Sequence, residues 1–185
     1  RTLRLEGADL AGVKFDQAII ATGSVPIALP GTEFRPGGRI MSSTGALELE
    51  DVPETLLVVG GGYVGLELGS VYASLGSKVT VVEMLPRLIA QSDPDLARPL
   101  VRRIEEIFED VYTETKVSEM TEHEDHVEVT FDGDVEPKTQ NFDRVLVAVG
   151  RRPNSGDLGL ENTDVEVNDR GFIVVDEEQR TADSR

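Results

Sequence analysis

A glycine-rich turn between an apolar run and a helical pattern is the part of this sequence whose residue types most directly indicate chemistry. Residues 55–59 (TLLVV) form the apolar run, and 60–65 (GGGYVG) follow with the spacing G-x-G-x-x-G. In such a turn Gly60 permits a sharp bend, Gly62 lets the backbone approach a pyrophosphate, and Gly65 lets the helix pack closely on the strand. Free N–H groups at the helix start would bind the phosphates. The pattern predicts a dinucleotide site over Gly60, Gly61, Gly62, Tyr63, Val64 and Gly65.

A carboxylate stands at the end of the next apolar run, about twenty residues after the glycines. Glu83 closes the segment 78–83 (KVTVVE), and Met84 beside it is included in the predicted NAD contacts. A carboxylate there accepts hydrogen bonds from ribose hydroxyls but repels a 2′-phosphate, which favours NAD over NADP. Arg87 keeps NADP open, because a guanidinium could pair with that phosphate. The structural alternatives are a turn that serves only helix packing and a solvent-exposed acid.

A β-α-β unit is needed to position these residues, and residues 55–83 have the pattern of one. Apolar residues recur at helical spacing between the two runs, and Gly76 stands where a helix-ending glycine belongs. The handedness rule for such units makes the two strands parallel neighbours. The predicted apolar face of the helix consists of Val64, Leu68, Val71, Tyr72 and Leu75.

Further elements are expected on both sides of this unit. A second helix is predicted to start with Asp93 as N-cap and Pro94 as its first residue, with an apolar face made of Leu96, Leu100, Ile104, Ile107 and Phe108. Strands are predicted within 15–23, 126–134, 141–150 and 171–176, with a hairpin around DGD at 132–134. The predicted fold class is α/β, a Rossmann-like three-layer domain with a parallel sheet, helices and a β-meander or hairpin.

The composition limits the classes of protein to which the chain can belong. The 185 residues are 39% hydrophobic, enough for one substantial core or two small ones. No apolar stretch approaches the ~20 residues that cross a bilayer, and the first residues lack the pattern of a secretory signal, so we expect a cytoplasmic protein. The absence of cysteine excludes a disulfide, a thiolate nucleophile and a Cys-ligated metal within this chain.

The charge of the chain is strongly acidic, with 35 Asp and Glu against 18 Lys and Arg and a net charge of -17. This charge repels nucleic acids and anionic membranes, so neither is an expected partner. The lysines are few: Lys14, Lys78, Lys116 and Lys138. An acidic excess with few lysines favours a salt-loving organism, in which concentrated ions screen the repulsion. An ordinary acidic bacterial enzyme is the alternative.

Two strand ends of similar sequence flank the β-α-β unit, at 18–26 (AIIATGSVP) and 145–154 (VLVAVGRRPN). Together with GGGYVGLELG and VTVVE, they resemble the FAD-dependent pyridine nucleotide–disulphide oxidoreductases. In that family such strand ends bracket an NAD-binding domain inserted into a flavin-binding one. The resemblance covers essentially the whole chain and is greatest to members that oxidise dihydrolipoamide. It implies the cofactors NAD and FAD, a homodimeric enzyme, and the lipoyl domain of a 2-oxoacid dehydrogenase complex as partner.

The resemblance implies roles at the flavin and at the place where the chain returns to the flavin domain. Thr22 and Gly23 correspond to a turn that touches the flavin nucleotide. Gly150 with Arg151 resembles the crossing where the chain returns to the flavin domain beside the nicotinamide site, which makes Gly150 an expected NAD contact and Arg151 an expected FAD contact. Val117 resembles the position whose backbone meets the adenine.

The resemblance also implies roles for two helix residues, and each has a structural alternative. Tyr63 lies where some relatives carry an aromatic lid over the flavin, but a half-buried aromatic at a helix start would have the same sequence. Glu67 is similar to the acid that orients the nicotinamide carboxamide and pairs with a lysine outside this chain. A solvated helix acid is its alternative.

The chain departs from the family pattern by lacking the redox pair C-x-x-x-x-C, the flavin-binding G-x-G-x-x-G and the interface domain. We expect an internal part of a longer enzyme, which binds nucleotide without turnover. Residues 1–30 and 152–185 would belong to the flavin side, 31–52 to a linker, and 53–151 to the NAD-binding domain. The alternatives are the NAD domain of an NADH oxidase, a mercuric reductase or a ferredoxin reductase, and a non-catalytic nucleotide-binding module.

The two histidines, His123 and His126, lie among carboxylates and raise the question of a metal site. No regular element positions a third or fourth ligand beside them, so no metal is expected. We interpret the segment as a loop or hairpin edge.

Overall fold

The computed structural model describes residues 2–7, 9 and 11–184 and divides into two compact units. One unit is Pro26–Arg151, and the other combines Arg1–Val25 with Arg152–Arg185. The predicted flavin-side segments, 1–30 and 152–185, include the residues 1, 8, 10 and 185, which lie outside the described ranges.

A five-stranded parallel sheet forms the centre of the larger unit, with strand order β4-β11-β5-β6-β7. Its strands are β4 (Ile40–Ser42), β11 (Arg144–Val147), β5 (Thr55–Val59), β6 (Lys78–Val82) and β7 (Asp110–Tyr112). Helix α2 (Tyr63–Leu75) connects β5 to β6, which are parallel neighbours with Leu57 opposite Thr80. The predicted β-α-β unit is therefore confirmed.

An antiparallel sheet of three strands, with order β10-β9-β8, forms a second layer. The strands are β8 (Lys116–Glu122), β9 (Val127–Asp132) and β10 (Thr139–Phe142). In β9 the residues Val127, Val129 and Phe131 are buried while the residues between them are more exposed, as expected for a strand with one covered face. The hairpin predicted around DGD is confirmed by the antiparallel pairing of β9 with β10.

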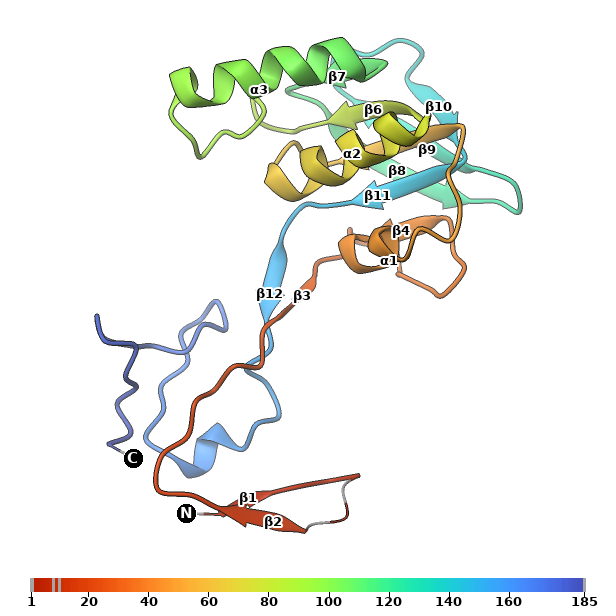
Figure 1. The fold of residues 1–185 in the computed structure, drawn as a ribbon. Helices are drawn as coiled ribbons and strands as arrows, with labels where there is room; N and C mark the ends of the chain where they lie inside the picture. The colour runs from red at the N-terminus through yellow and green to blue at the C-terminus, as the bar shows by residue number, and fades with distance from the viewer. Residues whose placement is uncertain (1, 8, 10, 185) are drawn as a thin grey trace. The chain divides into compact units, whose positions relative to one another are not determined.

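The parallel sheet is covered on both faces, because successive side chains of a strand point to opposite sides. Leu56 and Val58 of β5 belong to a core on the helix side, whereas Leu57 and Val59 belong to a core against the antiparallel sheet. Figure 1 shows helix α2 on one side of the parallel sheet and the strands β8, β9 and β10 on the other. The helix-side core contains Ala46, Leu56, Val58, Leu66, Leu68, Tyr72, Val79, Val81, Leu88, Ile104, Phe108 and Leu146. Helices, parallel sheet and antiparallel sheet make the three layers that the sequence predicts.

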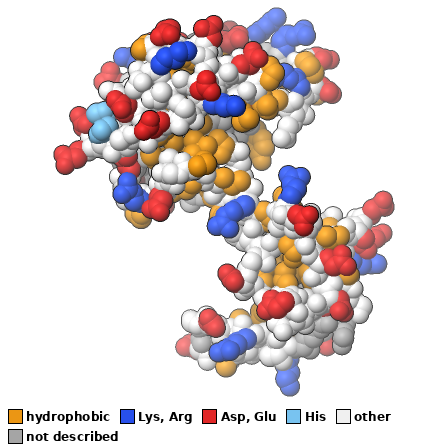
Figure 2. All heavy atoms as spheres, turned by 180° about the vertical axis from the view of Figure 1, so that it is seen from behind, with side chains coloured by type: hydrophobic (Ala, Val, Ile, Leu, Met, Phe, Trp, Pro, Cys, Tyr) orange, Lys and Arg blue, Asp and Glu red, His pale blue; other side chains and the backbone are white. Residues whose placement is uncertain are grey.

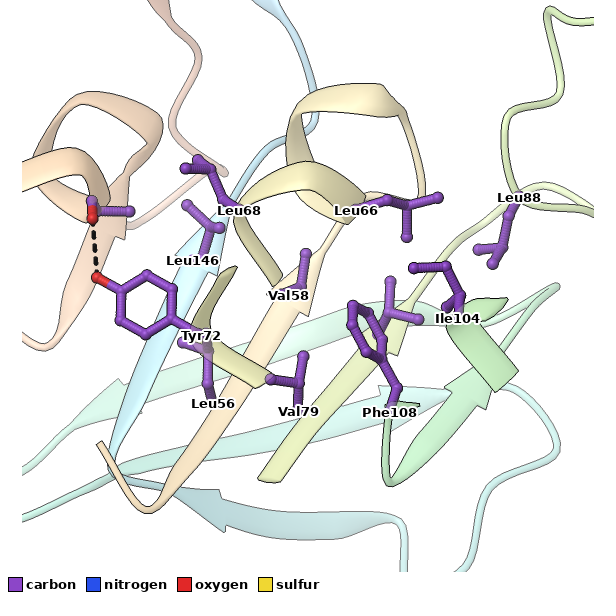
Figure 3. Packing of buried hydrophobic residues seen from close by; sticks show 12 residues of the cluster. Leu56, Val58, Leu66, Leu68, Tyr72, Val79, Leu88, Ile104, Phe108 and Leu146 are labelled. Carbon is purple, nitrogen blue, oxygen red and sulfur yellow. Dashed lines mark hydrogen bonds between the residues drawn. The ribbon is translucent and has the colours of Figure 1, made fainter. Parts of the chain in front are cut away.

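Helix α2 packs through Gly65, as the sequence predicts, and also through Gly69, which the sequence pattern did not indicate. Its buried residues are Gly65, Leu66, Leu68, Gly69 and Tyr72, several of which are drawn in Figure 3. A Cβ on Gly69 would lie 2.7 Å from Cζ of Phe108, so glycine lets the helix come close to that ring. The predicted apolar face is wrong for Val71 and Leu75, whose side chains are exposed.

Helix α3 (Pro94–Ile107) begins with the predicted proline and tolerates Pro99 in its first turns. Asp93 occupies the N-cap position, but its side chain makes no capping hydrogen bond. Ile104 is buried, whereas Leu96 is exposed, so the predicted apolar face is only partly correct.

The segment 31–52 is part of the larger unit, and its prediction as a linker is wrong. It supplies strand β4, which pairs with β11, and helix α1 (Ser43–Glu48). The Ser42 hydroxyl accepts a hydrogen bond from the Gly45 N–H at 3.2 Å and caps that helix. The Tyr72 hydroxyl donates to the Ala46 carbonyl at 2.8 Å and joins α1 to α2 (Figure 3).

The remaining elements are short. β1 (Thr2–Arg4) and β2 (Gly12–Lys14) form an antiparallel pair, β3 (Ser24–Pro26) pairs with β12 (Arg151–Pro153), and η1 (Leu160–Asn162) is a 3-10 turn.

The strand predicted within 15–23 is not formed, and Ile19 there is 94% exposed. The strand predicted at 171–176 is reduced to a single bridge between Val167 and Ile173. An apolar run becomes a strand only where a neighbour takes its backbone hydrogen bonds, and no other described segment forms a ladder with these two runs.

The surface reflects the acidic composition. Figure 2 shows carboxylates spread over one face of the molecule. Within the described ranges, no helix is both long enough and apolar enough to span a membrane.

Candidate dinucleotide-binding site

The glycine turn lies where β5 ends and α2 begins, at the carboxyl edge of the parallel sheet. The Gly60 N–H donates to the Val82 carbonyl of the neighbouring strand at 2.8 Å, and the Gly60 φ of +111° lies in the left-handed region. A Cβ at this position would lie 2.6 Å from the carbonyl oxygen of Ala148, which directly follows β11 on the other side of β5. Only glycine satisfies both conditions, as the sequence predicts for the first residue of the turn.

Gly65 and Gly62 are glycines for different reasons. A Cβ on Gly65 would overlap the Gly60 carbonyl oxygen and lie 3.0 Å from Cγ1 of Val58, so Gly65 sets how closely α2 approaches β5. Gly62 is the N-cap of α2 with φ -79°, which any residue adopts, and a Cβ there would meet nothing within 4 Å. The chain's own packing does not require glycine at position 62. The open space lies at a helix N-terminus, which is where a phosphate would approach.

The Glu83 carboxylate is held in place by two backbone donors. Its Oε2 accepts from the Gly61 N–H at 2.7 Å, and its Oε1 accepts from the Leu85 N–H at 2.8 Å. The side chain is half-buried at the end of β6. Each carboxylate oxygen has a second lone pair, so both can still accept a hydrogen bond from a hydroxyl. The acid is thus oriented beside the glycine turn with acceptor capacity left over.

Gly61 contacts the loop that follows Glu83, a feature that the sequence analysis missed. Its carbonyl accepts from the Ile89 N–H at 2.9 Å. A Cβ on Gly61 would overlap Cδ2 of Leu88 and lie 3.1 Å from Cβ of Glu83. The sequence offers no distinct signal for this contact, because Leu88 and Ile89 stand within a largely apolar connection, 84–92 (MLPRLIAQS).

Three predicted residues lie on α2 itself. Tyr63 is the first residue of the helix and is 68% exposed, while Val64 is half-buried against the helix-side core. Glu67 is exposed one turn further on, and no hydrogen bond or ion pair joins its side chain to another described residue. Positions 63 and 67 share one face of a helix, so both side chains are accessible on the same side of α2.

The other predicted NAD contacts lie on neighbouring strands and loops. Met84 is exposed beside Glu83. Val117 lies in β8 next to an irregularity in the pairing with β9, and Thr115 just before it donates its N–H to the Glu83 carbonyl at 3.0 Å. Gly150 has φ +145° and follows β11, whose carboxyl end shares an edge with that of β5. No described contact joins Val117 or Gly150 directly to the glycine turn.

The residues predicted to contact the flavin form hydrogen bonds with residues that are distant in the sequence. The Thr22 hydroxyl donates to the Asn154 carbonyl at 2.6 Å, and the Asn154 N–H donates to the Gly23 carbonyl at 3.0 Å. Arg151 donates from Nη1 to the Ser43 hydroxyl at 3.3 Å. The two strand ends predicted to be alike are therefore joined by hydrogen bonds at Thr22, Gly23 and Asn154.

The histidines stack in the turn between β8 and β9. Their ring centroids are 4.5 Å apart, and Nδ1 of His126 lies 2.7 Å from the Asp125 carboxylate. No group of three or more His, Cys, Asp or Glu residues in the described part of the chain is arranged to hold a metal ion.

Comparison with known proteins relates the chain to flavoenzymes. A family model described as pyridine nucleotide-disulphide oxidoreductase matches residues 2–185. The dihydrolipoyl dehydrogenase of Geobacillus stearothermophilus is 43% identical over 182 residues, which are 98% of this chain and 38% of that protein. The dihydrolipoyl dehydrogenase of Vibrio parahaemolyticus is 46% identical over 172 residues, 91% of this chain and 35% of that protein.

Solved structures give the same relation. LpdA from Mycobacterium tuberculosis matches with a TM-score of 0.76 and 28% identity, covering 88% of this chain and 34% of its own. The HOCl-induced flavoprotein disulfide reductase RclA from Escherichia coli matches with a TM-score of 0.75 and 32% identity, covering 88% and 36%. The chain therefore spans little more than a third of the length of these relatives. Because the family model covers nearly all of it, the chain belongs to the pyridine nucleotide-disulphide oxidoreductase family.

Proposed function

We propose that the unit Pro26–Arg151 is the NAD(H)-binding part of a flavoprotein oxidoreductase of the dihydrolipoyl dehydrogenase type. The observation that carries the proposal is the pairing of Glu83 with Gly61 beside Gly62, where an added Cβ would meet no protein atom within 4 Å. It supports the proposal because a carboxylate held next to a helix N-terminus could accept from ribose hydroxyls while the helix N–H groups bind a pyrophosphate. The relatives named dihydrolipoyl dehydrogenase, 43% and 46% identical, support the choice of enzyme type.

The proposed site assigns each part of an NAD molecule to its own residues. The pyrophosphate would lie at Gly62 and the first turn of α2, and the adenosine ribose at Glu83 and Met84. The adenine would extend toward Val117, and the nicotinamide toward Tyr63, Glu67 and Gly150. Since Gly61 donates its N–H to Glu83, the phosphates would depend on the N–H groups that follow it. The carboxylate at Glu83 makes NAD the favoured nucleotide over NADP.

FAD would supply hydride transfer with the nicotinamide when bound, and we propose that Thr22, Gly23 and Arg151 belong to its surroundings. These residues fix the chain locally through Asn154 and Ser43. The reaction would be the oxidation of dihydrolipoamide with reduction of NAD, through a redox disulphide that this chain does not contain. The proposed partners are a second subunit and the lipoyl domain of a 2-oxoacid dehydrogenase complex. We further propose a cytoplasmic protein of a halophile, supported by the net charge of -17.

Calorimetric titration of the chain with NADH, and separately with NADPH, tests the proposal at low and at molar potassium chloride. We expect saturable binding that is tighter for NADH, with molar salt needed if the protein is halophilic. Gly62→Ala should abolish binding because the methyl group fills the phosphate space. Gly156→Ala is the matched control, since a Cβ there also meets nothing within 4 Å. A folded protein that binds neither nucleotide would overturn the proposal.

A further inference from the structure

We infer that Ile89 is a positioning residue, which holds the Glu83 carboxylate in place for the nucleotide ribose by acting through Gly61. The inference rests on the proposed function, because it names what orients the residue that selects NAD. Ile89 lies in the connection 84–92 between β6 and α3, six residues beyond Glu83. It does not touch the proposed ribose position itself.

The two polar groups of Gly61 link Ile89 to Glu83. The Gly61 carbonyl accepts from the Ile89 N–H at 2.9 Å, and the Gly61 N–H donates to Glu83 Oε2 at 2.7 Å. Gly61 has no side chain to anchor it, and its position depends on these two bonds and on its neighbours in the turn. A shift of the Ile89 backbone would therefore move the donor that orients the carboxylate.

Ile89 adopts a conformation that its residue type disfavours. Its φ of +46° lies in the left-handed region, which is rare for β-branched residues and persists only where the surroundings impose it. Two contacts impose it here. The Ile89 side chain packs against the helix-side core, and its carbonyl accepts from the Ser92 N–H at 3.0 Å. The loop thus stays in a conformation that aims the Ile89 N–H at Gly61.

Leu88 fixes the same loop to the helix-side core. It is 2% exposed and belongs to the helix-side core, where it lies near Ile104 (Figure 3). Its Cδ2 occupies the place that a side chain on Gly61 would take. The absence of a side chain at position 61 is therefore what lets the loop and the Glu83 side chain close on the turn together. The middle glycine of the run serves this closure rather than the phosphate.

The chain offers a matched control for the backbone of Ile89. Leu49 also has a positive φ, +48°, and ends helix α1. It follows β4 and precedes β5, and none of its described contacts involves Gly61 or Glu83. Replacing either residue with glycine relieves the same backbone restriction and removes an aliphatic side chain. Only the change at Ile89 should affect the carboxylate.

The experiment compares Ile89→Gly, Leu49→Gly and the conservative Ile89→Val by amide hydrogen exchange and by nucleotide titration. In Ile89→Gly we expect the Gly61 amide to exchange about tenfold faster, since its acceptor is no longer fixed. The ratio of NADPH to NADH dissociation constants should fall at least about threefold, because a loosened carboxylate discriminates less against a 2′-phosphate. Leu49→Gly and Ile89→Val should change neither quantity. General loosening of the fold would alter stability in both glycine variants but would not shift this ratio.

Each outcome decides the inference. An unchanged Gly61 exchange rate or an unchanged selectivity ratio in folded Ile89→Gly would overturn it. If Ile89→Gly does not fold, the same comparison is made with Ile89→Ala, which shortens the side chain but restricts the backbone more than glycine does. If the unchanged protein binds no NADH, the proposed function fails, and the positioning role fails with it. If NADH binds and selectivity is unaffected by Ile89, only the positioning role fails.

Discussion

The Glu83 carboxylate accepts a hydrogen bond from the Gly61 N–H at 2.7 Å, across 22 residues of sequence. This bond joins the end of β6 to the turn after β5. A single contact thereby connects the residue that would select the nucleotide with the turn that would bind its phosphates. The chain's own backbone N–H groups at Gly61 and Leu85 hold the carboxylate, which limits the ordering cost of binding.

Replacing Glu83 with arginine should reverse the nucleotide preference. Glu83→Arg removes the acceptor for the ribose hydroxyls and adds a donor for a 2′-phosphate, so NADPH should bind more tightly than NADH. Competitive titrations with both nucleotides measure the change. Glu54→Arg is the control, because it makes the same charge change at an exposed acid just before β5, at the opposite edge of the sheet. An equal effect of both variants would show that only net charge matters.

Substitutions of the turn glycines should distinguish Gly65, which the fold needs, from Gly62, which the ligand needs. Gly65→Ala should reduce the free energy of unfolding by about 1–3 kcal/mol, because the added methyl overlaps the Gly60 carbonyl. Gly62→Ala should leave stability nearly unchanged, since its Cβ meets no protein atom. Urea unfolding followed by circular dichroism compares the two. Equal stability of the variants would contradict the packing role of Gly65.

The contact between α1 and α2 should contribute measurably to stability. Tyr72→Phe removes the donor to the Ala46 carbonyl and leaves that buried acceptor unpaired, which should cost about 1–3 kcal/mol. Tyr63→Phe is the control, because that tyrosine is 68% exposed at the start of α2. If Tyr72→Phe lowers the free energy of unfolding no more than the control does, α1 is not held to α2 through the Tyr72 hydroxyl.

Alkaline pH should weaken the same contact. Burial raises the pKa of Tyr72, and the nearby Asp51 carboxylate raises it further, while Arg144 lowers it. A phenol whose pKa is higher in the folded state stabilises the fold fully below its unfolded pKa of about 10. That stabilisation disappears as the pH rises through the folded value. The stability difference between the native protein and Tyr72→Phe should therefore shrink above pH 10.

Acid should weaken the contact between the loop 35–39 and β8. Burial alone would raise the pKa of Glu122, but hydrogen bonds from the Arg39 N–H at 2.5 Å and from Arg35 at 2.6 Å outweigh it and lower the pKa. The stabilisation is present above the unfolded pKa of about 4.3 and is lost as the pH falls through the lower folded value. Glu122→Gln should thus destabilise at pH 7 and have little effect at pH 2, whereas Glu119→Gln on the same strand should have little effect at either pH.

Local patterns in the sequence were sufficient to predict the β-α-β unit and its glycine turn. The run 55–59, the turn and Glu83 each carry a signal that depends only on near neighbours. The prediction of strands within 15–23 and 171–176 was wrong because an apolar run does not reveal whether another segment will pair with it. The segment 31–52 was predicted as a linker because it has no clear strand pattern. The three residues of β4 within it become a strand only through pairing with β11.

The contacts of Gly61 could not be predicted from sequence either. The position lies between the two glycines that the dinucleotide pattern explains, and the pattern allows any residue there. Its glycine makes sense only once Leu88 and Ile89 are seen to close on the turn from a loop that has no regular secondary structure. Burial of Gly69 against Phe108 is a similar case, because it depends on how α2 meets the residue after α3.

The most direct test of the account is a titration of the ¹⁵N-labelled protein with NADH, followed residue by residue in amide spectra. We predict that the largest shifts occur at Gly62 to Val64, where the phosphates would bind, and at Glu83 to Leu85, where the ribose would lie. The same shifts should be absent in Gly62→Ala. Shifts centred on the turn of His123 and His126, or no shifts at NADH concentrations that saturate related enzymes, would contradict the proposed site.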